Sequence, residues 1–441
     1  MELVLLIIMI MLVSLSGQAK QAVLTVWHTE TNDKTIAVMD AIGREFSKNR
    51  PNIRVQFEAI NWNELTERLN SAFATSRVPD LCHIQPNMGA SLFSRNRLVP
   101  LDDVIEHVGE NEIHEQVRDI LKFDGHYYGI PHAMGTSLIV YRRDLLLSKN
   151  LQDPKTWAEF LSVIRKLQEG HEAQAQKEFY GIDIPGGENH FMNCLFSMLV
   201  ASNGGRFINE ALEPTLDEEP IIQALNYFRA ISEFAKPGWA ERRYMDTLES
   251  IATESVACLY FGSPRAIEYI ERLADPGKRT PEVFAVLPDP YGPSGELGYA
   301  QLDCENWVIF RDSKHQKEAK EFLSFFYERK NYLDYCLSVP IHLMPVLKSM
   351  RTAPELLENQ QIKKWSSWYE QIQSKIEKGA CRPITLIAEK DDLQIPFLMQ
   401  FAESGIIRDM MMDVGAKGMT AKEAVRKAQQ RAASLLREWR H

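Results

Sequence analysis

The stretch FDGHYYGIPHAMGTSLIVYRRDLL, residues Phe123–Leu146, changes its hydrophobic pattern twice and decides how the chain is organised. The turn pair Asp124-Gly125, with aromatic residues on both sides, predicts a short hairpin arm that ends at Pro131. From Thr136 to Tyr141 the residues are β-branched and apolar, which predicts that a new strand begins there. A strand that stops and restarts can pass from one sheet to another. We therefore expect His132–Gly135 to be a crossing between two sheets.

The residues before this stretch alternate between strand and helix patterns. AVLTVWHTE, IRVQFEAI and PDLCHIQPNM predict strands, whereas TIAVMDAIGREFSKN and WNELTERLNSAFATS have apolar residues at helical spacing. Strand, helix, strand, helix, strand is the order typical of a parallel α/β lobe.

The residues after it repeat this alternation. Capping-box pairs at Thr156/Glu159 and Thr420/Glu423 predict two helix starts, and YGIDI, SVACLYF and VFAVL predict strands. Breaks near Pro288 and across 340–345 predict two more crossings, so three hinge crossings would connect two lobes beside a cleft. We expect an α/β fold with mixed sheets flanked by helices. The expected bounds are 20–132 plus 288–343 for lobe 1, and 133–287 plus 344–441 for lobe 2.

Size and charge narrow the class of protein. The chain has 441 residues, more than one hydrophobic core usually supports, which agrees with two lobes. Its formal net charge of −10 and the lack of a basic stripe with interleaved aromatic residues argue against a nucleic-acid partner.

The N-terminus resembles an export signal. Eleven apolar residues run from Leu3 to Val13 and are followed by small residues, with cleavage expected after Ala19. The run is shorter than the roughly 20 residues that span a bilayer. Glu2 is atypical of such signals, and an apolar first strand is the alternative. A signal peptide at 1–19 predicts a periplasmic or extracellular protein.

Six cysteines occur without C-x-x-C or metal-ligand spacing, so no metal site is expected from the sequence. Disulfides are possible in an exported chain, but most of the cysteines lie in apolar runs, which favours buried free thiols.

Several motifs together resemble one family. DGHYYGIPHAMGTSLIVYRRDLL, KTWAEFLSVIRKL, VASNGGRF, SVACLYFGSPRAI, DSKHQKEAKEFLSFF, ACRPI and GAKGMTAKEAVRKA occur in the order seen in extracellular solute-binding proteins of family 1. These are the sugar-type substrate-binding subunits of ABC importers. The resemblance implies a two-lobed periplasmic-binding-protein-like fold (type II) that captures a solute, closes and docks on permease subunits. It implies no cofactor, no nucleic acid and a monomer.

The resemblance also implies ligand contacts at matching positions. Sugar binders often have an acid where this chain has Gly135, Asp where it has Gln85, and Trp where it has Ser263, so a neutral disaccharide is in doubt. The implied contacts are His28, Thr29, Glu30, Gln85, Gly135, Thr136, Ser263, Asp303, Glu305, Trp307 and Arg382.

A sugar site needs flat apolar surface for ring C–H groups and polar groups for hydroxyls. Candidates at predicted strand ends therefore also include Asn61, Trp62, Asn189 and Tyr260, with core packing as the alternative for each aromatic residue. Trp157, Trp365 and Trp368 lie in predicted helices and are assigned to the core.

The charge of the solute stays open in the sequence. Arg265, His190 and His342 would suit a phosphorylated solute, whereas Glu30 and the pair Asp303 and Glu305 would suit an amino sugar. A polyol is a further alternative, as is a sensory receptor without transport.

Catalytic motifs are missing from the chain. Ser263 is not in G-x-S-x-G, His114-Glu115 does not begin H-E-x-x-H, and there is no P-loop or G-x-G-x-x-G. We therefore expect a binding protein with no catalytic residues.

Overall fold

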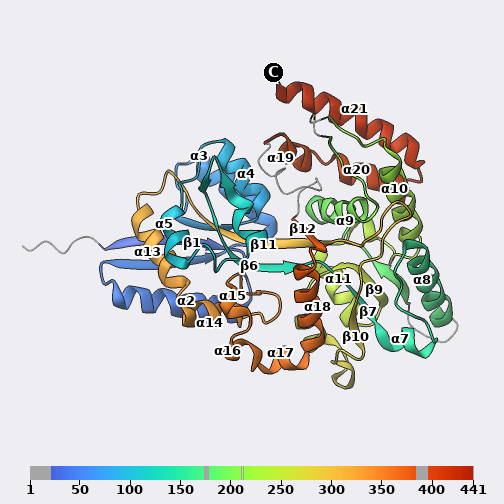
Figure 1. The fold of residues 1–441 in the computed structure, drawn as a ribbon, viewed down its shortest axis with the longest axis horizontal. Helices are drawn as coiled ribbons and strands as arrows, with labels where there is room; N and C mark the ends of the chain where they lie inside the picture. Colours follow the sequence, from blue (N-terminus) through green and yellow to red (C-terminus); the bar gives the residue numbers. More distant parts are fainter. Residues whose placement is uncertain (1–20, 173–177, 210, 212, 384–395, 441) are drawn as a thin grey trace, which may run out of the picture.

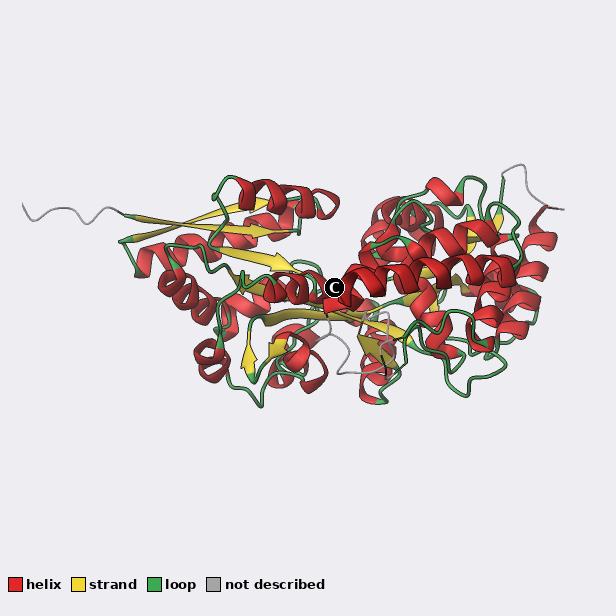
Figure 2. Cartoon of the chain, turned by 90° about the horizontal axis from the view of Figure 1, so that it is seen from above, coloured by secondary structure: helices red, strands yellow, loops and turns green. Residues whose placement is uncertain are grey.

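The computed structural model describes residues 21–172, 178–209, 211, 213–383 and 396–440, so the predicted signal at 1–19 lies outside the described residues. These residues form two bodies, each a β-sheet flanked by helices (Figure 1). Figure 2 shows both bodies from above, with strands passing between them. The body that holds the N-terminal strands is called lobe 1 and the other lobe 2. Across the described residues, every helix is too short or too polar to be a membrane span.

The sheet of lobe 1 is built from the N-terminal strands. Its order is β12-β11-β3-β1-β2, and β6 pairs with β11. β1 is parallel to β2 and β3, as the strand and helix pattern predicts, while β11 is antiparallel to β3. Leu24 and Val26 are fully buried in one core with Met39 and Phe46 of the first helix. The strands are β1 (Ala22–His28), β2 (Ile53–Ala59), β3 (Leu81–Ile84), β6 (Ile130–Thr136), β11 (Ala300–Ile309) and β12 (Cys381–Pro383).

The sheet of lobe 2 is mixed, as expected, in the order β10-β7-β9-β8. β7 is antiparallel to both β9 and β10, and β8 is parallel to β9. All seven residues of β9 are buried, because helices cover both faces. The strands are β7 (Leu138–Arg142), β8 (Tyr180–Asp183), β9 (Val256–Gly262) and β10 (Phe284–Leu287).

The stretch that decides the fold differs from expectation at one point. The hairpin is confirmed as β4 (Lys122–Phe123) and β5 (His126–Tyr127), with positive φ at Asp124 and Gly125 in the turn. The predicted strand break at Pro131 is wrong, because β6 continues through His132–Gly135. The chain does pass between two sheets here, as expected, but it does so at Ser137, between β6 of the lobe 1 sheet and β7 of the lobe 2 sheet. Pro131 is tolerated because β6 is an outer strand with a bulge beside it.

The bulge lies at His132. β11 pairs Glu305 with Ala133 and Asn306 with Pro131, so His132 is an extra residue in the ladder. An extra residue re-aims its side chain relative to regular alternation. His132 consequently lies against Trp307, with ring centroids 4.6 Å apart, on the β11 face that also carries Glu305.

A second connection joins β10 to β11 across the Pro- and Gly-rich segment 288–299. Gly295 and Gly298 lie so close to the backbone oxygens of Ser202 and Asp289 that a Cβ at either position would clash. The segment then enters β11, whose first residues pair with β12 at the junction of the lobes (Figure 1). The expected lobe bounds stay a prediction.

The helices surround the two sheets. Capping boxes at Thr156/Glu159 and Thr420/Glu423 are confirmed, and Trp157, Trp365 and Trp368 are buried in the core. Helices around lobe 1 are α2 (Asp33–Asn49), α3 (Leu65–Ala74), α4 (Pro86–Ser94), α5 (Asp102–Val108), α6 (Glu115–Arg118), α13 (Gln316–Phe326) and α14 (Arg329–Cys336). Helices around lobe 2 are α7 (Arg143–Ser148), α8 (Trp157–Glu172), α9 (Asn189–Ser202), α10 (Glu219–Ser232), α11 (Tyr244–Ala252), α12 (Ala266–Leu273), α20 (Ile406–Gly415) and α21 (Ala421–Arg440). The remaining helices are α15 (Lys348–Arg351), α16 (Pro354–Leu357), α17 (Gln360–Lys364), α18 (Ser366–Glu377) and α19 (Pro396–Glu403).

All six cysteines are buried free thiols, as the apolar runs predict. Burial raises the pKa of Cys381 to about 11, so this thiol is not a reactive thiolate at neutral pH.

Candidate functional site

A pocket lies where the two lobes and the strands between them meet. Its cavity has a volume of about 260 Å³, and its lining mixes aromatic rings with hydroxyl, amide and charged groups. Lobe 1 contributes the turn after β1 and the loop at Asn61 and Trp62, whereas lobe 2 contributes residues 188, 190–191, 243–246, 261–263 and 265. Thr136 of β6 and the residues of β11 that face the cavity lie between these two walls. A solute in the pocket would therefore contact both lobes at once.

Most of the residues expected at the site are brought together in this pocket. The expected contacts that line it are Thr29, Glu30, Asn61, Trp62, Gln85, Thr136, His190, Ser263, Asp303 and Glu305, together with Arg265 and His342. Gly135 lines a smaller adjoining pocket with Ala133 and Met134, and Asn189 borders an opening beside Trp62 and His190.

The other expected contacts lie outside this lining. His28, Tyr260 and Trp307 are at most 3% exposed and pack in the core, which is the alternative weighed for aromatic candidates. Arg382 pairs with Gln301 in the sheet, and its guanidinium lies 3.9 Å from the ring centroid of Tyr299. For Tyr260 and Trp307, strand positions near predicted ends do not distinguish a side chain facing the core from one facing a cleft.

The sequence reasoning missed part of the lobe 2 wall. Phe191 and Tyr244 stack with ring centroids 4.3 Å apart, and both line the pocket with Phe261. Arg243 and Asp246 stand beside them. Phe261 could have been found from its position two residues before Ser263, but nothing local in the sequence marks Tyr244, at the start of α11, as a pocket residue.

One ion pair crosses the pocket between the lobes. Arg265, just before α12, donates from Nη2 to Glu30 Oε1 at 2.7 Å and to Oε2 at 2.9 Å. The Glu30 and Arg265 side chains are 4% and 14% exposed. Burial alone would raise the pKa of Glu30, but the guanidinium outweighs it and lowers this pKa to about 2. The pair is therefore charged at neutral pH and couples the two lobes.

Two further acids stand on β11. Asp303 and Glu305 are two residues apart and face the same side of the strand. Burial raises the pKa of Asp303 to about 6, and burial together with the nearby charges of Glu30 and Asp303 raises the pKa of Glu305 well above its ordinary value. These carboxyl groups favour a partner that donates hydrogen bonds or carries positive charge.

The histidines of the pocket carry no charge at neutral pH. Burial lowers the pKa of His190 to about 4, and burial together with the charge of Arg265 lowers that of His342 to about 3. Neither residue supplies the positive charge that a phosphorylated solute requires. Arg265 is already paired with Glu30.

The polar groups of the pocket suit binding. The Ser263 hydroxyl accepts a hydrogen bond from Tyr244 OH at 2.6 Å and one from the backbone N–H of Arg265 at 3.3 Å, instead of lying beside an imidazole. Stacked aromatic rings next to carboxyl, amide and hydroxyl groups match the needs of a polyhydroxylated ring.

Comparison with protein families gives one broad match. A family model described as bacterial extracellular solute-binding protein matches residues 41–364, more than half of the chain.

Individual proteins resemble the chain over most of its length. YcjN of Escherichia coli (strain K12), named provisionally as an ABC transporter periplasmic-binding protein, is 23% identical over 341 residues, which cover 76% of each chain. The maltotriose-binding protein of Pyrococcus abyssi (strain GE5 / Orsay) is 23% identical over 335 residues, 75% of this chain and 68% of its own. Maltose-bound MalE3 of T. maritima superposes with a TM-score of 0.78 at 16% identity, over 94% of this chain and 100% of that chain. At this identity the likeness establishes the fold, and it confirms the two-lobed type II architecture expected from the sequence.

Proposed function

Because the chain belongs to the bacterial extracellular solute-binding protein family, we propose that it captures a saccharide or saccharide-derived solute and delivers it to an ABC importer. The observation that carries this proposal is the pocket between the lobes, which both lobes line with aromatic and hydrogen-bonding side chains. The names of relatives support the same class, since one is a maltotriose-binding protein and a similar structure holds maltose.

The charges of the pocket favour a neutral or cationic solute over a phosphorylated one. Glu188, Asp246, Asp303 and Glu305 line the cavity in addition to the paired Glu30 and Arg265, and Arg243 is the other lining cation among the described residues. An amino sugar would place its ammonium group near Asp303, whose buried carboxyl has no ion-pair partner among the described residues. A polyhydroxylated neutral sugar or polyol would use the same carboxyl groups as hydrogen-bond acceptors.

Binding would act through closure of the lobes. A solute that binds one lobe of the open form gains contacts from the other lobe when the protein closes. It therefore shifts the equilibrium between open and closed forms by the difference between its affinities for the two forms. Changing the ratio of closed to open protein from about 1:99 to 99:1 takes roughly 5.5 kcal/mol of difference in binding free energy. A micromolar ligand has about 8 kcal/mol of binding free energy in total, which is enough.

The similar proteins and the matching family are named for binding, and we infer a binding role without turnover for this chain as well. Transport requires membrane permease subunits, and we propose that an outer face of each lobe docks on them while the protein acts as an exported monomer. A sensory receptor that uses the same pocket without a permease is the alternative role.

A solute screen tests the proposal. Purified protein is heated with maltose, maltotriose, glucosamine, chitobiose, mannitol and a sugar phosphate, and hits are titrated by calorimetry. We expect saturable stabilisation by an uncharged or amino sugar at one site per chain, and no product in the recovered ligand. Stabilisation by the sugar phosphate alone would contradict the charge argument, and turnover of a hit would contradict the binding role.

A further inference from the structure

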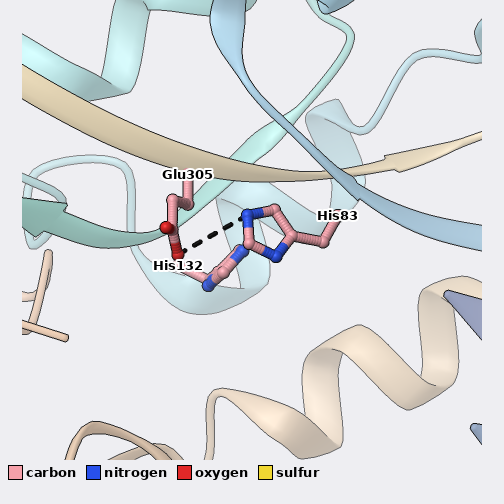
Figure 3. Close-up of side chains that lie close together, drawn as sticks. All are labelled: His83, His132 and Glu305. Atoms are coloured by element: carbon pink, nitrogen blue, oxygen red, sulfur yellow. Dashed lines mark ion pairs between the residues drawn. The ribbon is translucent and has the colours of Figure 1, made fainter. Parts of the chain in front are cut away.

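Three polar side chains lie close together next to the pocket, which Glu305 also lines (Figure 3). They are His83 of β3, His132 of β6 and Glu305 of β11, and one ligand atom from each lies within 4.8 Å of the others. His83 and His132 are fully buried. From these three residues we propose a binding site for a divalent transition-metal ion, with Zn²⁺ as its probe, on the lobe 1 sheet beside the pocket.

Strand pairing brings the three side chains together. His83 pairs with Trp307 across the antiparallel ladder, and Glu305 is two residues along β11, so both face one side of the sheet. The bulge adds His132 to that side, and its ring lies 4.6 Å from the ring of His83, centroid to centroid. Adjacent strands fix these positions, which is what a preorganised metal site needs.

The donor atoms that point at one another are short of partners. His132 Nε2 and Glu305 Oε2 are buried without a hydrogen bond among the described residues. His83 Nε2 lies 3.5 Å from Glu305 Oε2 and makes only a long contact of 3.5 Å with Thr29 Oγ1. A buried polar atom that makes no bond is costly, and a metal ion would satisfy all three atoms together.

The outer nitrogens of both histidines are held by hydroxyl groups. His132 Nδ1 lies 3.0 Å from Tyr335 OH, and His83 Nδ1 lies 2.9 Å from Thr29 Oγ1. Bonds of this kind orient metal-binding histidines and leave Nε2 as the ligand. For His83 this requires a proton on Nδ1, so the longer contact of 3.4 Å from the Thr29 backbone N–H is given up.

Geometry and ligand type fit a metal such as zinc. Bonds of about 2.0–2.1 Å in a tetrahedron place ligand atoms roughly 3.3 Å apart. The His83 and Glu305 atoms are close to this spacing, and the other separations, all within 4.8 Å, must shorten by at most about 1.5 Å. Two imidazoles and one carboxylate suit Zn²⁺, Ni²⁺, Cu²⁺ or Fe²⁺, and they leave a position for water. Glu305 also lines the pocket, which gives the ion a route from the cleft.

A neighbouring group of ligands is less suitable. Glu30, Glu305 and His342 also lie within reach of one another. Glu30 is already bonded by Arg265 and by Asn32 Nδ2 at 3.1 Å, and the guanidinium would repel a cation. The proposed ion therefore lies on the His83 and His132 side of Glu305.

Metal titration of the full chain without solute tests the site. Protein stripped with a chelator is titrated with Zn²⁺ by calorimetry, and Co²⁺ is added in parallel to record its visible spectrum. We expect one ion per chain, a raised thermal midpoint, and X-ray absorption showing nitrogen and oxygen ligands without sulfur.

Matched variants identify the ligands. His83→Gln, His132→Gln and Glu305→Gln should each weaken Zn²⁺ binding by at least ten-fold, whereas His126→Gln, an exposed histidine of lobe 1, should leave it unchanged. Thermal unfolding in chelator shows that each variant is folded. The proposal would be overturned if Zn²⁺ affinity survived both His132→Gln and Glu305→Gln, or if only His342→Gln abolished binding. Sulfur ligands in the X-ray absorption, or no Zn²⁺ binding by the folded parent, would overturn it as well. Because no solute is present, failure of this test leaves the proposed transport role untouched.

Discussion

The ion pair between Glu30 and Arg265 should control how tightly the lobes close. Replacing Arg265 by Met leaves Glu30, 4% exposed, as an unpaired charge in the closed form. Removing one partner of a buried pair costs about 3–5 kcal/mol, and the 14% exposure of Arg265 favours the lower end. The open form can hydrate Glu30, so most of this cost falls on closure. About 3 kcal/mol corresponds to a roughly 100-fold lower closed-to-open ratio, and solute affinity should fall by up to that factor.

A double-mutant cycle separates coupling from direct solute contact. Calorimetry with the solute found by the screen is run on the parent, Arg265→Met, Glu30→Gln and the double variant, and X-ray scattering measures the radius of gyration of each. Because the double variant buries no unpaired charge, it should recover to within about ten-fold of the parent affinity and should remain compact with solute. Losses that add up in the double variant would refute the reasoning, since both residues would then act as independent solute contacts.

Three other predictions concern single residues. Trp62→Ala should weaken saccharide binding about ten-fold, because the solute loses an aromatic contact at the cleft. The thermal midpoint without solute should stay unchanged, and an affinity equal to that of the parent in calorimetry would remove Trp62 from the site. Asp303→Asn should weaken an amino sugar more than its neutral counterpart, as measured by paired titrations, and an equal loss for both would contradict a charge contact. Burial lowers the pKa of His28 to about 4, below its value of about 6.5 in the unfolded chain. As the pH falls from about 6.5 towards 4, the unfolded chain takes up a proton that the folded chain does not, so the free energy of unfolding decreases. Urea unfolding in the presence of chelator measures how much the free energy of unfolding falls from pH 7 to pH 5. This fall should be about 2 kcal/mol smaller in His28→Gln than in the parent, and equal falls would show that His28 does not titrate in this range.

The alternation of apolar patterns was enough to predict the two sheets. Strand and helix periods identified the parallel β1, β2 and β3 unit, and capping pairs located the start of α8 and α21 because they act within four residues. The crossing was misplaced because Pro131 normally ends a strand. Its tolerance depends on β6 being an outer strand with a bulge, and both properties arise from pairing with β11, more than 160 residues away.

The site was predictable where the chain itself marks a strand end. Glu30, Asn61, Gln85 and Ser263 follow strands and face the pocket. Tyr260 and Trp307 belong to strands with both faces covered, where regular alternation does not show which side holds the cleft. Packing between residues far apart in the sequence determined which face of each strand lies at the cleft. The same packing placed His132 beside His83.

β11 joins two roles that most folds keep separate. Its middle residues Asp303 and Glu305 line the pocket, while its first residues pair with β12 and its last residues pair with β3 inside the lobe 1 sheet. We therefore expect substitutions at these two positions to change which solute binds without altering the parts of the pocket that the two lobes contribute. We expect related chains to differ in solute preference through these two positions while the strand pairing that holds them stays the same.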